Sequence, residues 1–253
     1  MKFGFCIGDD YDKIKIAQEC GADYVETGFN MLSRDPGGKF AAFADAIAAS
    51  DIRCESANCF MPGELKLVGE NVDYEAIGKY VEAGMRRGPE IGLKTVVFGS
   101  GGARSVPDGF PFDKACRQLA FFLKEYAGPT AEKYGIQIVV EPLCDCNIIN
   151  TGKEGAMLAA AADRPNVSGL VDLFHMAKIG DAIDNIRTLK GVIGHAHIAE
   201  PSDRRYPLSA EEYDYKAFVD ALIYAGCPRC SVEAGTDDFA AEAPVAMRIL
   251  KNL

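Results

Sequence analysis

Residues 136–173 contain the stretch that decides the fold. A short apolar run, Ile136-Gln-Ile-Val-Val-Glu141, is followed by an irregular segment, a helical pattern over Gly155–Ala162 and a second apolar run, Ser168-Gly-Leu-Val-Asp-Leu173. Short apolar runs are typical of buried strands, whereas apolar residues at three- and four-residue spacing indicate a helix. A strand, a helix and a second strand in this order predict parallel pairing through a right-handed crossover.

The same unit repeats along the whole chain at a period of about 30 residues, the length of one βα unit. The sequence predicts eight strands, at Lys2–Ile7, Tyr24–Thr27, Ile52–Ser56, Thr95–Phe98, Ile136–Glu141, Ser168–Leu173, Val192–Ile198 and Cys230–Glu233. Helical patterns between them include Phe40–Ala49, Tyr74–Arg87, Cys116–Tyr134, Gly155–Ala162, Tyr213–Tyr224 and Ala240–Leu250. Eight such units in 253 residues predict an α/β fold, a closed (β/α)8 TIM barrel. No Pro/Ser-rich linker divides the chain, so we expect residues 1–253 to form a single domain.

Composition excludes several classes of protein. The formal net charge is −10 and no cluster of Lys and Arg is present, so we expect no nucleic-acid partner. No run approaches the roughly 18 apolar residues of a membrane span. The first residues, MKFGFCIG, read as a strand rather than a signal peptide, which makes the cytoplasm the expected location. The nine cysteines are odd in number and scattered, which fits small buried side chains better than a disulfide framework.

Polar residues interrupt the last four apolar runs near their carboxyl ends. These residues are Glu141, Asp172, His197 and Glu233. An unpaired buried carboxylate costs several kcal/mol, so something must compensate Asp172 within its apolar run. The carboxyl ends of all strands meet at one face of a TIM barrel, which is where active sites of this fold lie. Carboxylates with one imidazole suit Mn²⁺, Mg²⁺ or Co²⁺, with Zn²⁺ as the alternative.

Each of these residues also has a purely structural interpretation. A single strand-end glutamate suits a salt bridge at the rim, and a pair such as His195 and His197 suits a hydrogen-bonded core. Four consecutive strands with the same feature at one depth favour the metal site.

The sequence resembles the sugar phosphate isomerase/epimerase family with the xylose-isomerase-like barrel, which includes ketose 3-epimerases, hydroxypyruvate isomerases and inosose dehydratases. The matching stretches are Val140-Glu-Pro-Leu, Asp172-Leu-Phe-His-Met, Gly194-His-Ala-His-Ile-Ala-Glu and Val232-Glu. The resemblance implies a divalent-metal-dependent isomerase or epimerase of a small sugar, sugar phosphate or hydroxy-keto acid. Proton transfer would pass through an ene-diolate between two glutamates.

The resemblance also implies roles for individual residues. Glu141, Asp172, His197 and Glu233 would hold the metal, and the two glutamates would act as acid and base. His175 would contact the substrate oxygens. An arginine after the Gly194–Glu200 stretch would assist, and of Arg204 and Arg205 we choose Arg204. The family's substrate-binding Glu in the loop after the first ligand has no match in this shortened loop, where Asp145 is the nearest acidic candidate.

Two other motifs leave alternatives open. The loop Gly99-Ser-Gly-Gly-Ala-Arg104 can cradle a phosphate with Arg104 as counter-charge, or its glycines can merely let the loop approach the pocket. The pairs Cys227/Cys230 and Cys144/Cys146 are spaced like zinc ligands, but they fall at opposite ends of the expected barrel and cannot share an ion.

Three other functions fit the same fold. A dehydratase or lyase would use the same metal and expel a β-hydroxyl group. A DNA-repair endonuclease of the related type uses three zinc ions and needs more than the three histidines present. A non-catalytic sugar-binding subunit would leave a buried carboxylate cluster uncompensated. By resemblance alone, the chain is expected to form a homo-oligomer.

Overall fold

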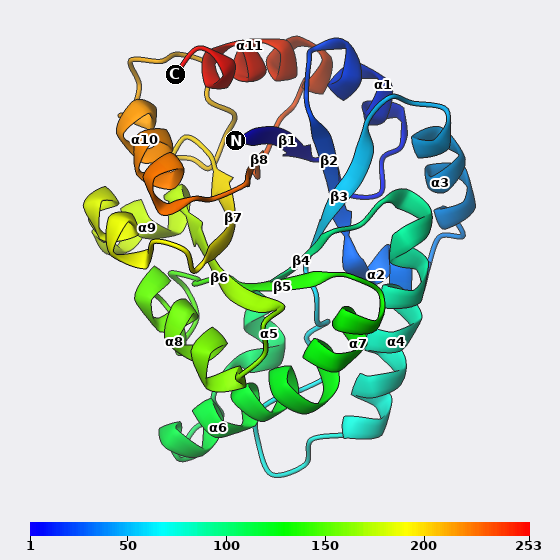
Figure 1. The fold of residues 1–253 in the computed structure, drawn as a ribbon, viewed down its shortest axis with the longest axis vertical. Helices are drawn as coiled ribbons and strands as arrows, with labels where there is room; N and C mark the ends of the chain where they lie inside the picture. The colour runs from blue at the N-terminus through cyan, green and yellow to red at the C-terminus, as the bar shows by residue number, and fades with distance from the viewer.

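The computed structural model describes residues 1–253 as a closed barrel of eight parallel strands, paired in chain order with β8 joined to β1. Looking down the barrel, Figure 1 shows the strands as a central ring and the helices as an outer ring. The strands are β1 Lys2–Cys6, β2 Tyr24–Gly28, β3 Arg53–Asn58, β4 Thr95–Phe98, β5 Gln137–Val140, β6 Val167–Asp172, β7 Ile193–Ile198 and β8 Arg229–Val232. The TIM-barrel prediction is confirmed.

The helices lie on the outside of the barrel, between consecutive strands. They are α1 Asp12–Glu19, α2 Phe29–Ser33, α3 Phe40–Ala48, α4 Tyr74–Ile91, α5 Gly101–Arg104, α6 Phe112–Phe122, α7 Gly128–Lys133, α8 Gly152–Ala162, α9 Leu173–Ile179, α10 Tyr215–Ala225 and α11 Phe239–Lys251. The helix predicted over 116–134 is divided by a π-helical turn, η1 Leu123–Ala127. Pro129 follows this turn and has no N–H to donate, so the regular α-helical hydrogen bonding cannot continue through it. A 3-10 helix, η2 Ile183–Leu189, follows α9.

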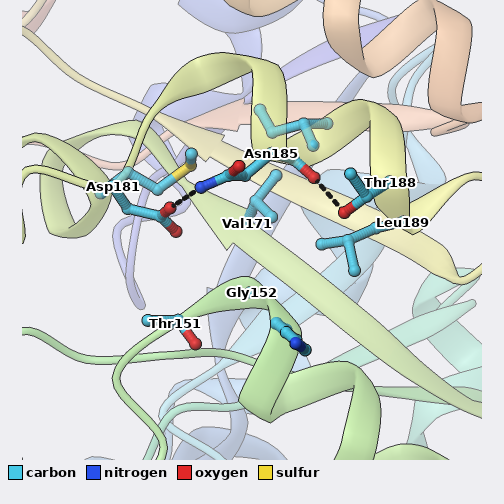
Figure 2. Close-up of a pocket in the computed structure, with 10 residues that line it drawn as sticks. Thr151, Gly152, Val171, Asp181, Asn185, Thr188 and Leu189 are labelled. Carbon is cyan, nitrogen blue, oxygen red and sulfur yellow. Dashed lines mark hydrogen bonds between the residues drawn. The ribbon is translucent and has the colours of Figure 1, made fainter.

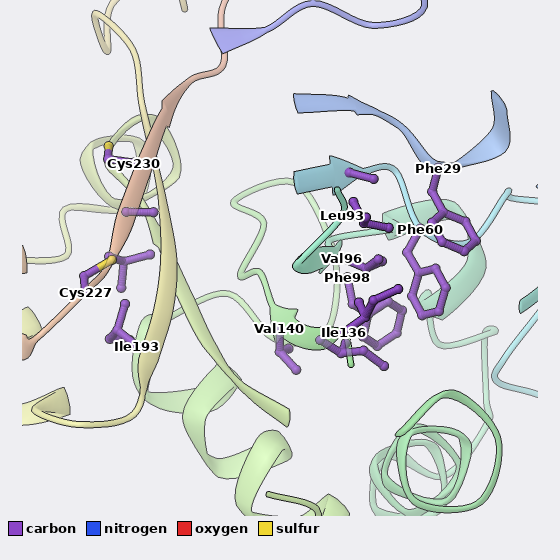
Figure 3. Packing of buried hydrophobic residues seen from close by; sticks show 14 of the residues in the cluster. Phe29, Phe60, Leu93, Val96, Phe98, Ile136, Val140, Ile193, Cys227 and Cys230 are labelled. Carbon is purple, nitrogen blue, oxygen red and sulfur yellow. The ribbon is translucent and has the colours of Figure 1, made fainter. Parts of the chain in front are cut away.

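The main hydrophobic core lies between the strands and the surrounding helices. Phe29, Phe60 and Phe98 pack edge to face there, with ring centroids 4.8 and 6.2 Å apart along the series (Figure 3). Cys227 and Cys230 are buried in the same core, as expected for cysteines that act as small hydrophobic side chains.

The interior of the barrel has an apolar side and a polar side. Val97, Val139 and Leu170, from β4, β5 and β6, form an apolar cluster separate from the main core. A fully buried group of polar side chains from β2, β7 and β8 lies elsewhere in the interior: Tyr24, Glu26, His195, His197 and Ser231. Because side chains alternate along a strand, these residues share one face of the sheet with the carboxylates at the strand ends. None of the helices combines the length and the hydropathy that a membrane span requires.

Candidate active site

Four side chains from the last four strands converge at the carboxyl end of the barrel. One potential ligand atom from each of Glu141, Asp172, His197 and Glu233 lies within 4.8 Å of the others. The backbone N–H groups of Glu141 and Glu233 donate to Phe98 and Ile198 on the neighbouring strands, at 3.1 Å in both cases. The glutamates therefore extend the hydrogen-bonded ladder, and the barrel fixes where their side chains begin.

His197 is at the centre of this group. Its Nδ1 atom lies 2.9 Å from Glu141 Oε1, 3.2 Å from Glu233 Oε2 and 4.0 Å from Asp172 Oδ2. Three carboxylates thus surround one imidazole nitrogen, and the imidazole is fully buried.

Asp172 ends β6 and caps the helix that follows it. Its Oδ1 atom accepts hydrogen bonds from the backbone N–H groups of Phe174, at 2.7 Å, and His175, at 3.4 Å. This N-cap orients the carboxylate and leaves Oδ2 directed at the other site residues. Burial, together with the neighbouring Glu233, raises the pKa of Asp172.

The two glutamates have pKa values shifted in opposite directions. Burial and the proximity of Glu233 raise the pKa of Glu141. Burial also acts to raise the pKa of Glu233, but His197 and Arg204 outweigh it and hold that pKa at about 2. Glu233 Oε1 also accepts a hydrogen bond of 2.8 Å from Asn58 Nδ2. Two carboxylates with separated pKa values are the arrangement that acid and base chemistry requires.

Arg204, and not Arg205, reaches the carboxylates. Its Nη2 atom donates to Glu233 Oε2 and lies 3.4 Å from Asp172 Oδ2, and its guanidinium stacks on the Phe174 ring at 4.7 Å. Arg205 instead forms ion pairs with Glu200 and Glu212, at 3.5 and 3.0 Å.

His175 is buried beside the same carboxylates, with one nitrogen free. The backbone N–H of Cys144 donates to Nδ1 at 3.2 Å, so the ring proton resides on Nε2. Nε2 has no hydrogen-bond partner and lies 3.7 Å from Asp172 Oδ2. A buried donor without a partner is suited to a ligand oxygen.

An open cavity of about 510 Å³ gives access to these groups. Its lining includes Glu141, His175, Arg204 and Glu233, and Asp145 lies at its exposed rim. A hollow of about 600 Å³ lies on the outer side of the barrel between α8 and η2 (Figure 2). Its lining carboxylate, Asp181, already accepts a 2.6 Å hydrogen bond from Asn185, and no metal-ligating group converges there. Of the two cavities, only the first is therefore lined by members of the convergent set.

The prediction that Arg104 is the counter-charge for a phosphate bound by the Gly99–Arg104 loop is wrong. This side chain is fully buried and donates to the backbone carbonyls of Phe98, Glu141 and Ile149, at 3.1, 2.7 and 3.1 Å. Its guanidinium stabilises the loops and cannot reach a ligand. Gly99 instead allows the loop to approach the pocket closely, because a Cβ atom there would lie 2.1 Å from Glu141 Oε2.

Glu26 is the site residue that sequence reasoning missed. Its carboxylate is fully buried below the four convergent side chains, with Oε1 3.0 Å from His197 Nε2 and Oε2 2.9 Å from His195 Nε2. The signal was present, because Glu26 interrupts the apolar strand Tyr24–Gly28 as Asp172 interrupts β6. The Cys6 thiol was also missed, and it lies within 4.8 Å of potential ligand atoms of His197 and Glu233.

The chemistry of this donor set fits a divalent cation. Three carboxylates and one imidazole converge while a single guanidinium, that of Arg204, is paired with them. Buried negative charge in excess of its partners is costly, and a cation bound to these oxygens and to Nδ1 would offset it. The residues that would hold such an ion are Glu141, Asp172, His197 and Glu233.

The family model described as xylose isomerase-like TIM barrel matches residues 14–253. The chain belongs to this family. The resemblance noted from the sequence motifs is therefore confirmed at the level of the family. A search of the curated proteins returns no match.

Solved structures with the same fold include several sugar epimerases. Apo 3-keto-D-glucoside 4-epimerase YcjR from E. coli shares 18% identity over 100% of both chains, with a TM-score of 0.82. D-allulose 3-epimerase from Methylomonas sp. in complex with D-allulose shares 18% identity over 100% of this chain and 96% of its own, with a TM-score of 0.84. The IolI protein, solved with a bound zinc atom, shares 20% identity over 100% of this chain and 96% of its own, with a TM-score of 0.70. At these identities the likeness concerns the fold.

Proposed function

We propose that this chain is a divalent-metal-dependent isomerase or epimerase of a small sugar. The observation that carries the proposal is the convergence of Glu141, Asp172, His197 and Glu233 at the open end of the barrel, two glutamates among them. Solved structures with the same fold include sugar epimerases, which agrees with this chemistry. Mn²⁺, Mg²⁺ or Co²⁺ suits the oxygen-rich donor set, and the bound zinc of IolI keeps Zn²⁺ as the alternative.

The proposed reaction moves one proton next to a carbonyl group. A divalent cation held by the four residues would polarise the carbonyl and adjacent hydroxyl oxygens of the sugar, which lowers the cost of the negative charge that develops there. We assign Glu233 as the first acceptor, because Asn58 and Arg204 keep it ionised and it is more exposed to the cavity than Glu141 (18% against 7%). Loss of the carbon-bound proton leaves an ene-diolate.

Return of the proton completes the reaction. For epimerisation, Glu141 in its protonated form would donate a proton to the opposite face of the same carbon; Glu233 would then release the proton it has taken to solvent, and Glu141 would be reprotonated from solvent. For isomerisation, Glu233 would return its proton to the neighbouring carbon while the hydroxyl proton moves to the former carbonyl oxygen. His175 Nε2–H would donate a hydrogen bond to a substrate oxygen, and Arg204 would hold Glu233 in position. Asp145 would contact hydroxyl groups at the rim.

The charges in the cavity favour an uncharged sugar over a sugar phosphate or a hydroxy-keto acid. The lining carries three acidic residues, Glu141, Asp145 and Glu233, and its one cationic residue, Arg204, is already paired. The other arginine near the cavity, Arg104, is bound to backbone carbonyls. Apart from the proposed metal ion, an anionic substituent would therefore meet like charge and no unpaired cationic side chain.

The test is ¹H NMR of candidate ketoses in D₂O with the metal-loaded protein. We expect deuterium to enter at a carbon next to the carbonyl only when metal is present. Glu233→Gln should slow this exchange by roughly 10²- to 10⁴-fold, the usual contribution of a general base. Glu211→Gln, at an exposed glutamate on the same face, is the matched control and should exchange at the wild-type rate. Metal-dependent release of water with formation of an unsaturated or deoxy product would instead favour the dehydratase alternative.

A further inference from the structure

We propose that Glu26 is a positioning residue for the metal centre, whose carboxylate accepts a hydrogen bond from His197 Nε2–H and so presents the Nδ1 lone pair to the cation. This inference rests on the metal-dependent function proposed above. Glu26 belongs to β2, whereas the four proposed ligands belong to β5–β8 and the residues directly after them. The residue thus acts from another part of the barrel wall.

The two nitrogens of His197 face different partners. Nδ1 faces Glu141, Glu233 and Asp172, the carboxylates that would share the cation with it. Nε2 faces Glu26 Oε1 at 3.0 Å. A cation requires a bare nitrogen, and a carboxylate acceptor requires a nitrogen that bears a proton. Only the tautomer with its proton on Nε2 offers a donor to Glu26 and a lone pair to the cation. The other tautomer would direct a lone pair at the Glu26 carboxylate and an N–H group at the metal.

A separate set of hydrogen bonds keeps Glu26 an anionic acceptor in a fully buried position. Its Oε2 atom accepts from Ser231 Oγ at 2.7 Å and from His195 Nε2 at 2.9 Å. His195 Nδ1 is buried without a partner, so the proton of this ring belongs on Nε2, where it has an acceptor. Tyr24 lies 2.8 Å from Ser231 through its hydroxyl group. Three hydrogen-bond donors thus stabilise this buried carboxylate in its ionised form.

The contact between Glu26 and His197 involves the one nitrogen that a positioning role requires. A purely structural carboxylate would contribute to stability whatever nitrogen of His197 it contacted. A positioning carboxylate must contact the nitrogen opposite the ligand atom, and Glu26 does so. Loss of a carboxylate that orients a metal-bound histidine typically weakens metal binding by about 10- to 100-fold.

The first experiment compares Mn²⁺ binding by calorimetry to metal-stripped wild type, Glu26→Gln and Glu55→Gln. We expect Glu26→Gln to weaken Mn²⁺ binding by about 10- to 100-fold, since the amide can donate as well as accept and no longer selects one tautomer. Glu55→Gln is the matched control, because it makes the same change in a carboxylate that is hydrogen-bonded to Arg229 and does not contact the proposed ligands; we expect a change of less than about threefold. Equal affinities for wild type and Glu26→Gln would overturn the inference.

The second experiment needs no variant to fold. Long-range ¹H–¹⁵N correlation spectra of the Mg²⁺-loaded wild type report which nitrogen of each imidazole bears the proton, and the chain has only three histidines. We expect His197 to bear its proton on Nε2, with no proton on Nδ1. A proton on Nδ1 would overturn the inference even if the metal binds tightly. Failure of the wild type to bind Mn²⁺ or Mg²⁺ at all would overturn the proposed function and this inference together, which distinguishes the two failures.

Discussion

The two ends of the barrel differ in how many cationic partners their carboxylates have. At the amino end, Glu55 of β3 accepts hydrogen bonds from Lys2 of β1 and from Arg229 of β8, the latter at 2.9 Å, and Arg229 also donates to Thr95 at 2.8 Å. One carboxylate there has two cationic partners. At the carboxyl end, three carboxylates share one guanidinium and one imidazole. The carboxylate at the amino end is balanced by its own cationic partners, whereas the carboxyl end has an excess of carboxylates, which the proposed metal ion would offset.

This difference separates stability from function within one fold. Charged groups at the bottom of a TIM barrel are expected to stabilise it, and groups at the top are expected to act on ligands. Substitutions of the same chemical kind at the two ends, such as Glu141→Gln and Glu55→Gln, should therefore have opposite consequences for stability.

The largest expected effect is on metal binding by Glu141→Gln. Removal of a ligand carboxylate should weaken Mn²⁺ binding more than the loss of a residue that only orients a ligand, hence by more than about 100-fold. The metal-free variant should nevertheless be at least as stable as the wild type. The pKa of Glu141 is raised by burial and by Glu233, so keeping this carboxyl ionised at neutral pH costs free energy in the folded state, and the neutral amide removes that cost. Calorimetry and urea unfolding measure the two quantities. A large loss of stability in the metal-free variant would contradict the claim that the carboxylates at the carboxyl end destabilise the metal-free fold.

Arg204→Gln should have a smaller effect, about 10-fold or more on the rate of deuterium exchange into a ketose substrate, because Glu233 loses the guanidinium that holds it. Arg205→Gln is the matched control. Arg205 pairs with Glu200 and Glu212 away from the convergent carboxylates, and its loss should change the rate by less than about twofold. Equal effects of the two substitutions would contradict the assignment of Arg204.

The smallest expected effect is on stability at the other end of the barrel. Glu55→Gln should lower the free energy of unfolding by about 1 kcal/mol at pH 7, after allowance for solvent screening of this partly exposed group. Lys2 and Arg229 lower the pKa of Glu55 although burial acts to raise it. A carboxyl with a lowered pKa stabilises the fold above its unfolded-state pKa of about 4.3, and this contribution is lost as the pH falls through the folded-state value. Urea unfolding between pH 7 and 3.5 should show the difference between wild type and variant shrinking in acid. Metal binding by the variant should stay unchanged.

The strand pattern and the four convergent residues could be predicted from the sequence because both are local signals. A strand-end carboxylate in an apolar run is visible one strand at a time, and barrel closure then brings Glu141 and Glu233 together without further information. Glu26 also interrupts an apolar strand, but this strand is β2 and not one of the last four. Its contact with His197 could therefore be recognised only once the closed barrel was known.

The contacts of the arginine side chains could not be predicted from the sequence. Arg104 follows a glycine-rich loop in the sequence, yet its guanidinium turns inward to three backbone carbonyls. Arg204 and Arg205 are adjacent in the chain and reach different carboxylates. Neither outcome follows from spacing, because a flexible side chain of this length reaches several partners and only tertiary contacts select one.

The most direct test of the account is calorimetric titration of Mn²⁺ into the metal-stripped chain. The account predicts one ion per chain, bound with a large rise in melting temperature, because a ligand at 100 times its Kd stabilises the folded state by about 2.7 kcal/mol. The same rise should appear in Glu55→Gln and be absent in Glu141→Gln. No saturable binding by the wild type, or binding that Glu141→Gln leaves intact, would contradict the claim that the carboxyl end of this barrel is a metal centre.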